Sequence, residues 1–395
     1  MLQEKKILLC LCGGIAAYKC IEMASLLVKS GAIVKTIMTK SAMEFVTPLT
    51  FQTITKNRVV YNLFDSNGPI EHISLSDWAD IIVIIPATAN IIGKLANGIA
   101  DDLLTTTVMA STCPKLVVPA MNVKMFENPI VQDNLRKLKQ YDYKILPVET
   151  GRLACGYVGA GRLLAIKEVI YAIKTFLTYS RDLINKSILV TAGASIEKID
   201  PMRYITNVSS GKMGLAIARA ASFRGGNVTF VHSLIKEKVP FYLQNAQTFS
   251  ANDMYVHLMQ IFTNFDIIIM CAAVADYTIN SPSEKKIKKA GTFTLELERT
   301  KDILEDMGKN KKEHQYLIGF AAESENLLQN AIEKLQKKKI DMIVANDLNT
   351  AGKDISEIVI LKENSFDKDG LISHKGDKFY IAHKILDEYK NAKST

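Results

Sequence analysis

Short runs of apolar residues recur along the first half of this 395-residue chain and alternate with helical patterns. Runs that are apolar at nearly every position are typical of parallel strands whose two faces are both covered by helices. The pattern therefore predicts a doubly wound α/β domain. The expected strands are Ile7–Leu11, Ile33–Met38, Ile81–Ile85, Lys115–Val118 and Lys144–Leu146.

The second half repeats this alternation but not the motifs of the first, which indicates a fusion and not an internal duplication. A chain of this length is also too long for one ordinary core. The polar stretch 178–187 is the expected linker, so we predict two consecutive doubly wound domains over residues 1–180 and 187–395. The strands expected in the second are Ser187–Thr191, Asn227–Val231, Asp266–Met270, Tyr316–Gly319, Met342–Ala345 and Ile358–Leu361.

The N-terminus allows two interpretations. Two lysines, an apolar run and small residues follow one another as in a signal peptide. The alternative is a first strand, a glycine turn and a helix whose apolar positions continue through Leu27 and Val28, which a cleaved signal would not need. We favour the strand, and no apolar run approaches the roughly 20 residues of a membrane span. The six cysteines contain no C-x-x-C pair, which favours reduced thiols in the cytoplasm and gives no sign of a metal site.

The net charge of +8 raises the question of nucleic-acid binding. The lysines are scattered except for clusters at 285–289 and 334–339, and no basic stripe with interleaved aromatic residues appears. Anionic small molecules account for such clusters equally well. We therefore expect small-molecule substrates, with neither a nucleic acid nor a membrane as partner. A nucleic-acid binder would instead be retained on DNA with a steep salt dependence.

Small or hydroxyl-bearing residues follow the predicted strands of the first half at the point where each strand ends. In sheets of this type, ligands bind at the carboxyl ends of the strands, and helix N-termini there suit phosphate groups. Any one of these segments could be only a tight turn, but three such turns, together with Thr39, at successive strand ends favour a ligand site. The segments are Cys12–Ala16, Thr39, Pro86–Asn90 and Pro119–Asn122.

The segments GGIAAYK, PATANIIGKLANGIADDLL, PAMN and ACGYVGAGR together resemble the FMN-dependent cysteine decarboxylase family. The resemblance implies a flavodoxin-like domain with FMN as cofactor. It also implies that His72, Asn122 and Cys155 carry the chemistry. The residues that it places around the flavin are Gly13, Gly14, Ile15, Ala16, Thr39, Thr88 and Asn90.

Each of the three catalytic assignments has a simpler alternative. His72 titrates near neutrality and suits thiol oxidation, although a lone loop histidine is more often only solvated. Asn122 can donate its amide to the substrate carboxylate, although PAMN could be a simple turn. Cys155 lies among glycines, which favours a mobile lid that delivers a thiol proton over a buried structural cysteine. Tyr157 stands where the family commonly has an acidic residue, so we assign it no role.

In the second half, residues 191–214 follow a strand and lead into a helix. The segment is not a P-loop, because Thr206 stands where that motif needs glycine. Its backbone from Asn207 to Gly214 nevertheless suits a phosphorylated substrate. This segment, CAAVADY at 271–277, EKKIK at 284–288, GFAAE at 319–323 and AND at 345–347 resemble the phosphopantothenoylcysteine synthetases.

This second resemblance implies a Rossmann-like ligase domain that uses CTP and forms an acyl-cytidylate. It implies that Asn207 stabilises the acyl-cytidylate and that Lys285 neutralises phosphate charge. Mg²⁺ should bridge the phosphates, with protein ligands unassigned. The residues implied for nucleotide binding are Asp276, Lys285, Thr300, Lys301, Asp302, Ile303, Phe320, Lys334 and Lys338.

The lysines also allow a simpler interpretation. Lys334 and Lys338 are four residues apart on a predicted helix, so they repel one another unless an anion lies between them. A solvated charged face is the alternative. The run 285–289 is either a flexible solvated loop or a flap that closes over phosphate. The family pattern is altered at two places: Ala194-Ser195 replaces Pro-Thr but keeps a hydroxyl, and Thr300-Lys301-Asp302 replaces Asn-Pro-Asp.

Together the two resemblances cover residues 5–390 and imply a bifunctional enzyme of coenzyme A biosynthesis. Such an enzyme makes 4′-phosphopantetheine from 4′-phosphopantothenate, cysteine and CTP. The family also implies a homo-oligomer, with trimers of the flavin domain and dimers of the ligase domain forming a dodecamer. The alternatives are another flavin enzyme, such as a flavin prenyltransferase, or a non-catalytic regulatory subunit. The presence of His72, Asn122 and Cys155 argues against both.

Overall fold

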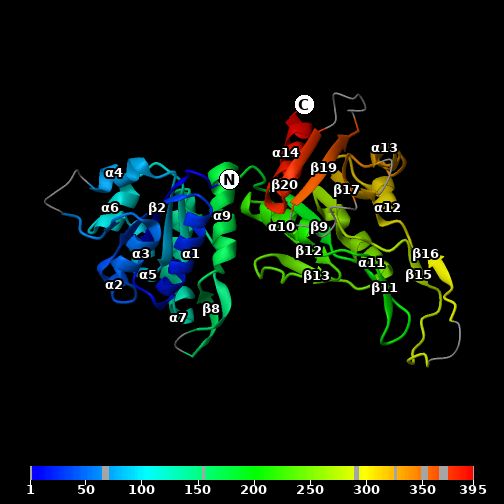
Figure 1. Cartoon of the computed structure of the whole chain (residues 1–395), viewed down its shortest axis with the longest axis horizontal. Coiled ribbons are helices and arrows are strands. Elements are labelled where there is room, and N and C mark those ends of the chain that lie inside the picture. The colour runs from blue at the N-terminus through cyan, green and yellow to red at the C-terminus, as the bar shows by residue number, and fades with distance from the viewer. Residues whose placement is uncertain are drawn as a thin grey trace. The chain divides into compact units, whose positions relative to one another are not determined.

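The computed structural model describes residues 2–64, 71–153, 156–288, 293–323, 327–347, 355–363 and 372–394. The chain divides into two compact units, Met1–Ser180 and Arg181–Thr395. Each unit contains its own central sheet with helices around it (Figure 1). The predicted fold class, two consecutive doubly wound α/β domains, is confirmed.

Unit 1 contains a parallel six-stranded sheet in the order β3-β2-β1-β4-β5-β6. Each apolar run predicted in this half forms one of its strands. The run at the N-terminus is β1, in the middle of the sheet, as expected of a strand followed by a glycine turn. The strands are β1 (Lys6–Leu11), β2 (Ile33–Met38), β3 (Val59–Val60), β4 (Ile81–Ala87), β5 (Lys115–Pro119) and β6 (Lys144–Ile145).

Helices cover both faces of this sheet, which explains why its strands are apolar at nearly every position. Side chains alternate between the two faces, so Leu8 and Cys10 of β1 pack against α4, α5, α6 and α8. On the other side, α1 packs beside α3 and α9. The helices are η1 (Ile15–Tyr18), α1 (Lys19–Lys29), α2 (Lys40–Met43), α3 (Pro48–Thr55), α4 (Glu71–Trp78), α5 (Ala89–Ala96), α6 (Leu103–Ala110), α7 (Val123–Phe126), α8 (Pro129–Gln140) and α9 (Ile166–Thr178).

The glycine-dense segment that we predicted to be a lid is an antiparallel hairpin of β7 (Glu149–Arg152) and β8 (Val158–Arg162). The base of the hairpin is fixed, because Gly161 has a φ of +130° and its carbonyl accepts a hydrogen bond of 2.9 Å from the Met121 N–H. A Cβ on Gly161 would lie 2.3 Å from the Met121 carbonyl oxygen. This part of the prediction was therefore incomplete: the segment is a strand pair, anchored by close backbone packing.

Unit 2 contains an eight-stranded sheet in the order β13-β12-β9-β14-β17-β18-β19-β20. It is parallel from β13 to β18, and β19 and β20 continue it in antiparallel register. All six predicted runs form strands, whereas β13 and β20 were not predicted. The strands are β9 (Ser187–Ala192), β12 (Asn227–His232), β13 (Gln244–Gln247), β14 (Ile267–Met270), β17 (Tyr316–Glu323), β18 (Met342–Asp347), β19 (Ile355–Lys362) and β20 (Ile372–Asp377).

Helices again cover this sheet, with α10 and α14 packed together on one side. The helices are α10 (Lys212–Phe223), α11 (Ala251–Ile261), η2 (Phe262–Asn264), α12 (Ile303–Asn310), α13 (Leu327–Lys337) and α14 (Lys378–Ser394). Gly214 of α10 allows the helix to approach the sheet closely, since a Cβ there would lie 2.6 Å from the Ala192 Cβ of β9. The start of α10 is thereby held directly over the end of β9.

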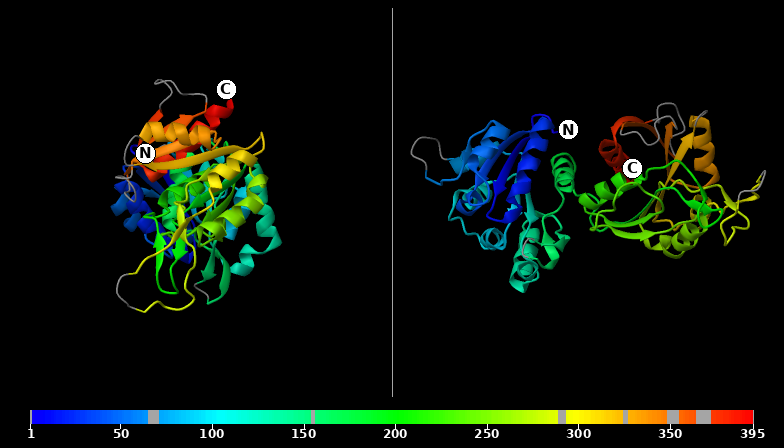
Figure 2. Two further views of the ribbon diagram at one scale, coloured as in Figure 1. Left: turned by 90° about the vertical axis from the view of Figure 1, so that its right-hand side faces the viewer. Right: turned by 60° about the horizontal axis from the view of Figure 1, so that its bottom comes forward.

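Two small strand pairs extend from the main sheet of unit 2 as an arm (Figures 1 and 2). They are β10 (Ile196–Lys198) with β11 (Tyr204–Thr206), and β15 (Tyr277–Ile279) with β16 (Leu297–Arg299). The first pair leads directly to Asn207, and β15 directly follows Asp276. The arm therefore carries two of the sequence motifs predicted for the ligase.

The stretch 178–187, predicted as the linker, is largely part of unit 2. Leu183 is buried in the core of unit 2, and Asp182 forms an ion pair of 2.7 Å with the buried Arg224. The polarity of this stretch therefore reflects specific ion pairing. It does not indicate a solvated spacer.

Candidate active sites

A large cavity lies at the carboxyl edge of the sheet in unit 1, with a volume of about 1380 Å³. Its walls are the turns after β1, β2, β4 and β5, so the four predicted strand-end segments meet at one place. The strand order puts the switch point between β1 and β4, where doubly wound sheets bind ligands. The predicted flavin residues that line the cavity are Gly13, Gly14, Ile15, Ala16, Thr39, Thr88 and Asn90.

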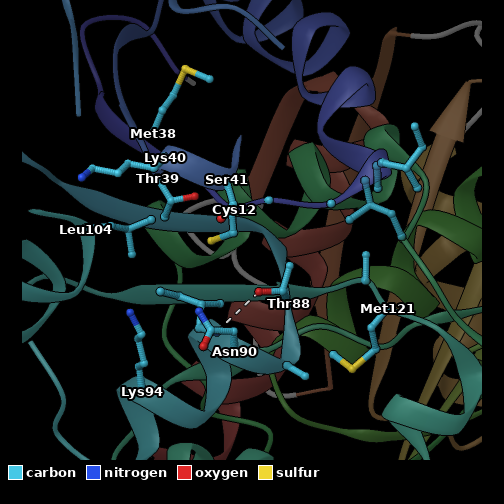
Figure 3. Close-up of a pocket in the computed structure, with 18 of the residues that line it drawn as sticks. Cys12, Met38, Thr39, Lys40, Ser41, Thr88, Asn90, Lys94, Leu104 and Met121 are labelled. Carbon is cyan, nitrogen blue, oxygen red and sulfur yellow. Dashed lines mark hydrogen bonds between the residues drawn. The ribbon is translucent and has the colours of Figure 1, made fainter. Parts of the chain in front are cut away.

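Thr39 and Thr88 each begin a helix at this edge. The Thr39 hydroxyl accepts a hydrogen bond of 3.2 Å from Ala42 N–H, and the Thr88 hydroxyl accepts one of 3.4 Å from Ile91 N–H. Both residues are therefore helix N-caps, as the simpler interpretation of tight turns requires. They also border the cavity, where Figure 3 shows Thr39, Thr88 and Asn90 around one space. The capping and ligand-binding interpretations are compatible, because capped helix N-termini suit anions.

The turn after β1 fits a phosphate cradle. Gly13 packs so closely on the turn after β2 that a Cβ would lie 2.3 Å from the Ser41 Cβ. Gly14, in an extended conformation, precedes the helical turn η1. Backbone groups instead of side chains thus form the wall of the cavity at this turn. The volume of the whole cavity exceeds the roughly 300–1,000 Å³ typical of small-molecule sites. The residues present fit the phosphate and ring system of a flavin mononucleotide.

The thiols near this cavity are held neutral. Cys12 lines the cavity and Cys20 lies in α1 behind it. Burial raises the pKa of Cys20 to about 12, and it raises the pKa of Cys12 even further. Neither thiol supplies a thiolate at neutral pH.

Asn122 lines the same cavity from the turn after β5. Its side-chain oxygen accepts a hydrogen bond of 2.9 Å from Lys124 N–H and caps α7. Of the two polar atoms of this side chain, the amide nitrogen is the hydrogen-bond donor, and a donor is what a carboxylate requires. The hairpin β7–β8 is packed beside Asn122 through Gly161, and Arg152, Leu153 and Arg162 of this hairpin also line the cavity.

The other two predicted catalytic residues stand differently. His72 lies in helix α4, which spans Glu71–Trp78, whereas we predicted a loop at this position. It is not among the residues that line the cavity of its own unit, and its Nδ1 is buried without a hydrogen-bond partner among the described residues. Cys155 falls outside the described residues, between the two strands of the hairpin.

In unit 2, the switch point lies between β9 and β14, and the segments after these strands are joined by hydrogen bonds. The Asn207 side chain donates to the carbonyls of Ala273 and Val274 at 3.3 and 3.2 Å. The buried hydroxyl of Ser195 accepts a hydrogen bond of 2.9 Å from Ala275 N–H. The hydroxyl kept by the Ala194-Ser195 replacement therefore fixes the segment that carries Asp276.

Several residues predicted for nucleotide binding are linked to one another. Thr300 donates its hydroxyl to the Ala275 carbonyl at 2.6 Å and its N–H to the Asp276 carbonyl at 3.0 Å. Lys334 donates to the Phe320 carbonyl at 3.2 Å. Lys301 lies over the ring of Tyr255, 4.6 Å from its centre. Ile303 differs, because its side chain is buried in the core and only its backbone can reach a ligand.

The repulsion expected between Lys334 and Lys338 is relieved within the protein itself. Lys338 forms an ion pair of 2.6 Å with Asp302, which also caps α12. Burial is the largest single influence on Asp302 and would raise its pKa, but the hydrogen bonds from Lys338 and Glu305 N–H and the charges of Lys338 and Lys334 together hold the pKa below its ordinary value. The anion beside Lys338 is thus a carboxylate of this chain.

Two family models match the chain. The model described as "Flavoprotein" matches residues 1–178, and the one described as "DNA/pantothenate metabolism flavoprotein C-terminal domain" matches residues 183–392. The coenzyme A biosynthesis bifunctional protein CoaBC of Bacillus subtilis is 46% identical over 358 residues, which are 89% of this chain and 88% of that protein. The CoaBC protein of Borreliella burgdorferi is 42% identical over 367 residues, 92% of this chain and 94% of its own.

The chain belongs to the CoaBC family. Among solved structures, the C-terminal domain of a CoaBC protein is similar to this chain at 37% identity and a TM-score of 0.46. That similarity covers 54% of this chain and 99% of the other.

In this CoaBC family member the cavity also contains an ion-pair cluster that the sequence analysis did not single out. Lys94 lines the cavity and contacts Asp101 at 2.7 Å and Asp102 at 3.4 Å. The hydrogen bond to Asp101 is the main reason that the pKa of Lys94 is raised. All three residues lie in the motif PATANIIGKLANGIADDLL. Lys94 precedes Asp101 and Asp102 by seven and eight residues, and their contact could not be predicted without knowing the turn between α5 and α6.

The described ranges contain neither a membrane-spanning helix nor a cluster of metal-ligating side chains. Every helix found there is too short or too polar to cross a membrane. Nor do three or more His, Cys, Asp or Glu side chains converge there as metal ligands would.

Proposed function

We propose that unit 2 joins 4′-phosphopantothenate to cysteine and that unit 1 decarboxylates the product to 4′-phosphopantetheine. Membership in the CoaBC family makes the chain a bifunctional enzyme of coenzyme A biosynthesis. The observation that carries the assignment of unit 1 is the cavity in which the turns after four strands meet. The family match over residues 183–392 supports the assignment of unit 2.

In the proposed ligase step, the carboxylate of 4′-phosphopantothenate attacks the α-phosphate of CTP and pyrophosphate leaves. The cysteine amine then attacks the acyl-cytidylate, and cytidine monophosphate leaves. Asn207 is held against the segment after β14 and would orient the acyl-cytidylate. Lys285 would neutralise phosphate charge, and Asp276, Phe320 and Lys334 would border the nucleotide. Mg²⁺ would be held mainly by the phosphates.

In the proposed decarboxylase step, FMN would supply the two-electron oxidation of the cysteine thiol that creates the electron sink for loss of CO₂, and would return the two electrons as a hydride afterwards. The glycine turn after β1 would hold the flavin phosphate, and the helix N-termini capped by Thr39 and Thr88 would border the flavin. The Asn122 amide would orient the substrate carboxylate, and Cys155 would return a proton after CO₂ has left. Lys94 would keep its charge throughout, because Asp101 and Asp102 stabilise its protonated form.

The proposal includes a homo-oligomer, the dodecamer that the family resemblance implies. His72 lies outside the cavity of its own unit, so a role in thiol oxidation would require it to act in the cavity of another copy. Its partially buried position in α4 is consistent with a surface that is covered on assembly. A cytoplasmic location fits the five free cysteines of the described residues.

The two half-reactions can be tested separately on the full-length protein. With 4′-phosphopantothenate, cysteine, CTP and Mg²⁺, the protein should release pyrophosphate. With phosphopantothenoylcysteine alone and bound FMN, it should release CO₂ and form 4′-phosphopantetheine. ATP in place of CTP tests nucleotide choice. A purified protein that takes up no FMN and shows no flavin absorbance would overturn the assignment of unit 1.

Two variants test the assigned residues. Cys155→Ser should still release CO₂ but stop before 4′-phosphopantetheine, with the ligase unchanged. Asn207→Asp should reduce the ligase activity at least tenfold and leave the decarboxylase activity unchanged, because the negative charge of the new carboxylate would repel the phosphates. Equal damage to both activities by either variant would indicate misfolding and not loss of a specific role.

A further inference from the structure

Asp200 is a carboxylate in the turn between β10 and β11, and its side chain is fully buried. Its Oδ1 accepts hydrogen bonds from the N–H groups of Met202 and Arg203 at 2.8 and 2.9 Å. Its Oδ2 accepts from the Arg203 guanidinium, with Nε at 3.0 Å, and from Ile287 N–H at 3.1 Å. The side-chain hydrogen bond from Arg203 is the main reason that the pKa of Asp200 is lowered.

The contact with Ile287 joins two segments that are far apart in the sequence. While Ile287 donates its N–H to Asp200, its carbonyl accepts a hydrogen bond of 3.0 Å from Arg203 Nη2. One Asp–Arg pair thus binds both backbone groups of a single residue, as a neighbouring strand would. A second contact lies four residues earlier, where Ser283 N–H donates to the Ile199 carbonyl at 2.9 Å.

These contacts define a strap, residues 283–287, that is held at both ends to the β10–β11 turn. Lys285 lies in the middle of the strap with an exposed side chain. Its backbone is also held, because the Ser283 hydroxyl donates to the Lys285 carbonyl at 2.6 Å. Hydrogen bonds therefore hold the backbone of residues 283–287, while the side chains of residues 284–286 are exposed to solvent.

The same turn determines the position of Asn207. Arg203 immediately precedes β11, and β11 ends at Thr206, whose hydroxyl donates to the Ser195 carbonyl at 2.7 Å. Asn207 then contacts the carbonyls after β14. The Asp200–Arg203 pair thus connects the backbone that carries Asn207 with the backbone that carries Lys285.

We infer that Asp200 is a positioning residue of the ligase, which together with Arg203 holds the strap so that Lys285 is presented in a fixed register with Asn207. The inference rests on the proposed roles of Lys285 and Asn207. A bidentate Arg–carboxylate pair is rigid, and here the carboxylate is buried although the arginine is exposed. A phosphate-neutralising lysine is most effective when its backbone does not have to be ordered during the reaction. Asp200 itself touches no substrate in this assignment.

The variant that tests this is Asp200→Asn, which keeps an oxygen for Met202 and Arg203 N–H but removes the charge that binds the guanidinium. We expect the ligase kcat to fall at least tenfold, the KM for cysteine to change less than threefold, and decarboxylation of phosphopantothenoylcysteine by the same protein to stay unchanged. Arg203→Lys, which keeps the charge but cannot bridge Asp200 and Ile287, should act in the same direction. Glu298→Gln, an exposed carboxylate on β16 of the same arm, should leave the ligase unchanged.

A double-mutant cycle separates positioning from a general structural role. If Asp200 acts through Lys285, the variant Asp200→Asn/Lys285→Ala should be no slower than Lys285→Ala alone. If Lys285→Ala is impaired and the double variant loses the product of the two single-variant rate factors, the inference is overturned, and the proposed function is unaffected. A fully active Lys285→Ala would remove the role assigned to Lys285 and the inference with it.

Discussion

At the residue scale, His383 shows how burial in unit 2 controls protonation. It lies in α14, fully buried, with its ring centre 4.5 Å from that of Phe379 and its carbonyl bound by Arg224 at 3.2 Å. Burial lowers the pKa of His383 to about 3, and the positive charge of Arg224 lowers it in the same direction. The fold therefore accepts only the neutral imidazole.

This arrangement predicts a loss of stability in mild acid. The unfolded chain binds the proton at a pKa of about 6.5, so the contribution of His383 is fully present above that pH and decreases as pH falls toward 3. Between pH 6.5 and 5 the loss is about 2 kcal/mol. The measurement is urea unfolding of unit 2 at pH 6.5 and at pH 5. Between these two pH values the free energy of unfolding of His383→Gln should fall by about 2 kcal/mol less than that of the parent protein.

The matched control for this prediction is His314→Gln, since His314 is exposed. It should keep the pH dependence of the parent protein. If His383→Gln loses as much stability between pH 6.5 and 5 as the parent does, another group is responsible for the acid sensitivity.

A second residue-scale consequence concerns the pair of Lys338 and Asp302. Because Lys338 already has a carboxylate partner at 2.6 Å, binding of a nucleotide phosphate must compete with Asp302. Asp302→Asn should therefore free Lys338 for the phosphate and keep the cap of α12, because asparagine caps helices about as well as aspartate. We expect the KM for CTP to change at least threefold, with the KM for cysteine unchanged. Steady-state kinetics in which both constants change equally would contradict a nucleotide-specific role.

At the element scale, the hairpin β7–β8 is held beside Asn122 by a backbone contact that only glycine permits. Gly161→Ala would place a Cβ 2.3 Å from the Met121 carbonyl at a φ of +130°. We expect this to displace the hairpin, to reduce the decarboxylase at least tenfold and to destabilise unit 1 by about 1–3 kcal/mol. The ligase, measured by pyrophosphate release, should be unchanged.

The other strand of the hairpin offers the control. In Gly151→Ala the new Cβ would meet only the Arg162 side chain, at an ordinary distance of 3.5 Å. This variant should keep most of the decarboxylase activity. Similar losses in both glycine variants would show that hairpin flexibility, and not the contact with Met121, is what matters.

The elements that could be predicted from sequence are those whose burial is visible in the sequence itself. Strands covered on both faces, such as β1 from Ile7 onward and β4, consist of continuous apolar runs. The strands of the arm and the hairpin are mostly exposed or half-buried and contain polar residues, and those of the hairpin also contain glycine, so nothing in their local sequence separates them from loops. Contacts such as that of Gly161 with Met121 form them, and those contacts are tertiary.

The candidate sites divide in the same way. The turns around the cavity of unit 1 could be predicted because parallel strands end at one edge, so Thr39 and Thr88 must lie near one another. The ion pair of Lys338 with Asp302 joins residues 36 positions apart. The hydrogen bond from Ile287 N–H to Asp200 joins residues 87 positions apart. Neither contact has a spacing that a helix or a hairpin would impose, so only the folded chain shows them.

At the scale of the whole molecule, each unit has its own sheet and core, and the chain between them adds few residues. Leu183 packs in the core of unit 2, and the buried Arg224 binds Asp182 at 2.7 Å and Asp387 at 2.8 Å. These ion pairs connect the beginning of unit 2 with α14 near its end. Each unit should therefore unfold as a cooperative body of its own.

This organisation predicts that ligands stabilise the two units selectively. A ligand at 100 times its Kd adds about 2.7 kcal/mol to the unit that binds it, or about 5–10 °C in Tm for units of this size. Calorimetry of the full-length protein should show two transitions, one raised by FMN alone and the other by CTP with Mg²⁺ alone. Cytidine without phosphates serves as the control and should raise neither transition appreciably, since the proposed lysine contacts are to phosphate. A single transition that both ligands raise equally would mean that the two units unfold together. The variant Arg224→Met, which should destabilise unit 2, gives a second check. If it also abolishes the transition that FMN raises, the folding of unit 1 depends on unit 2.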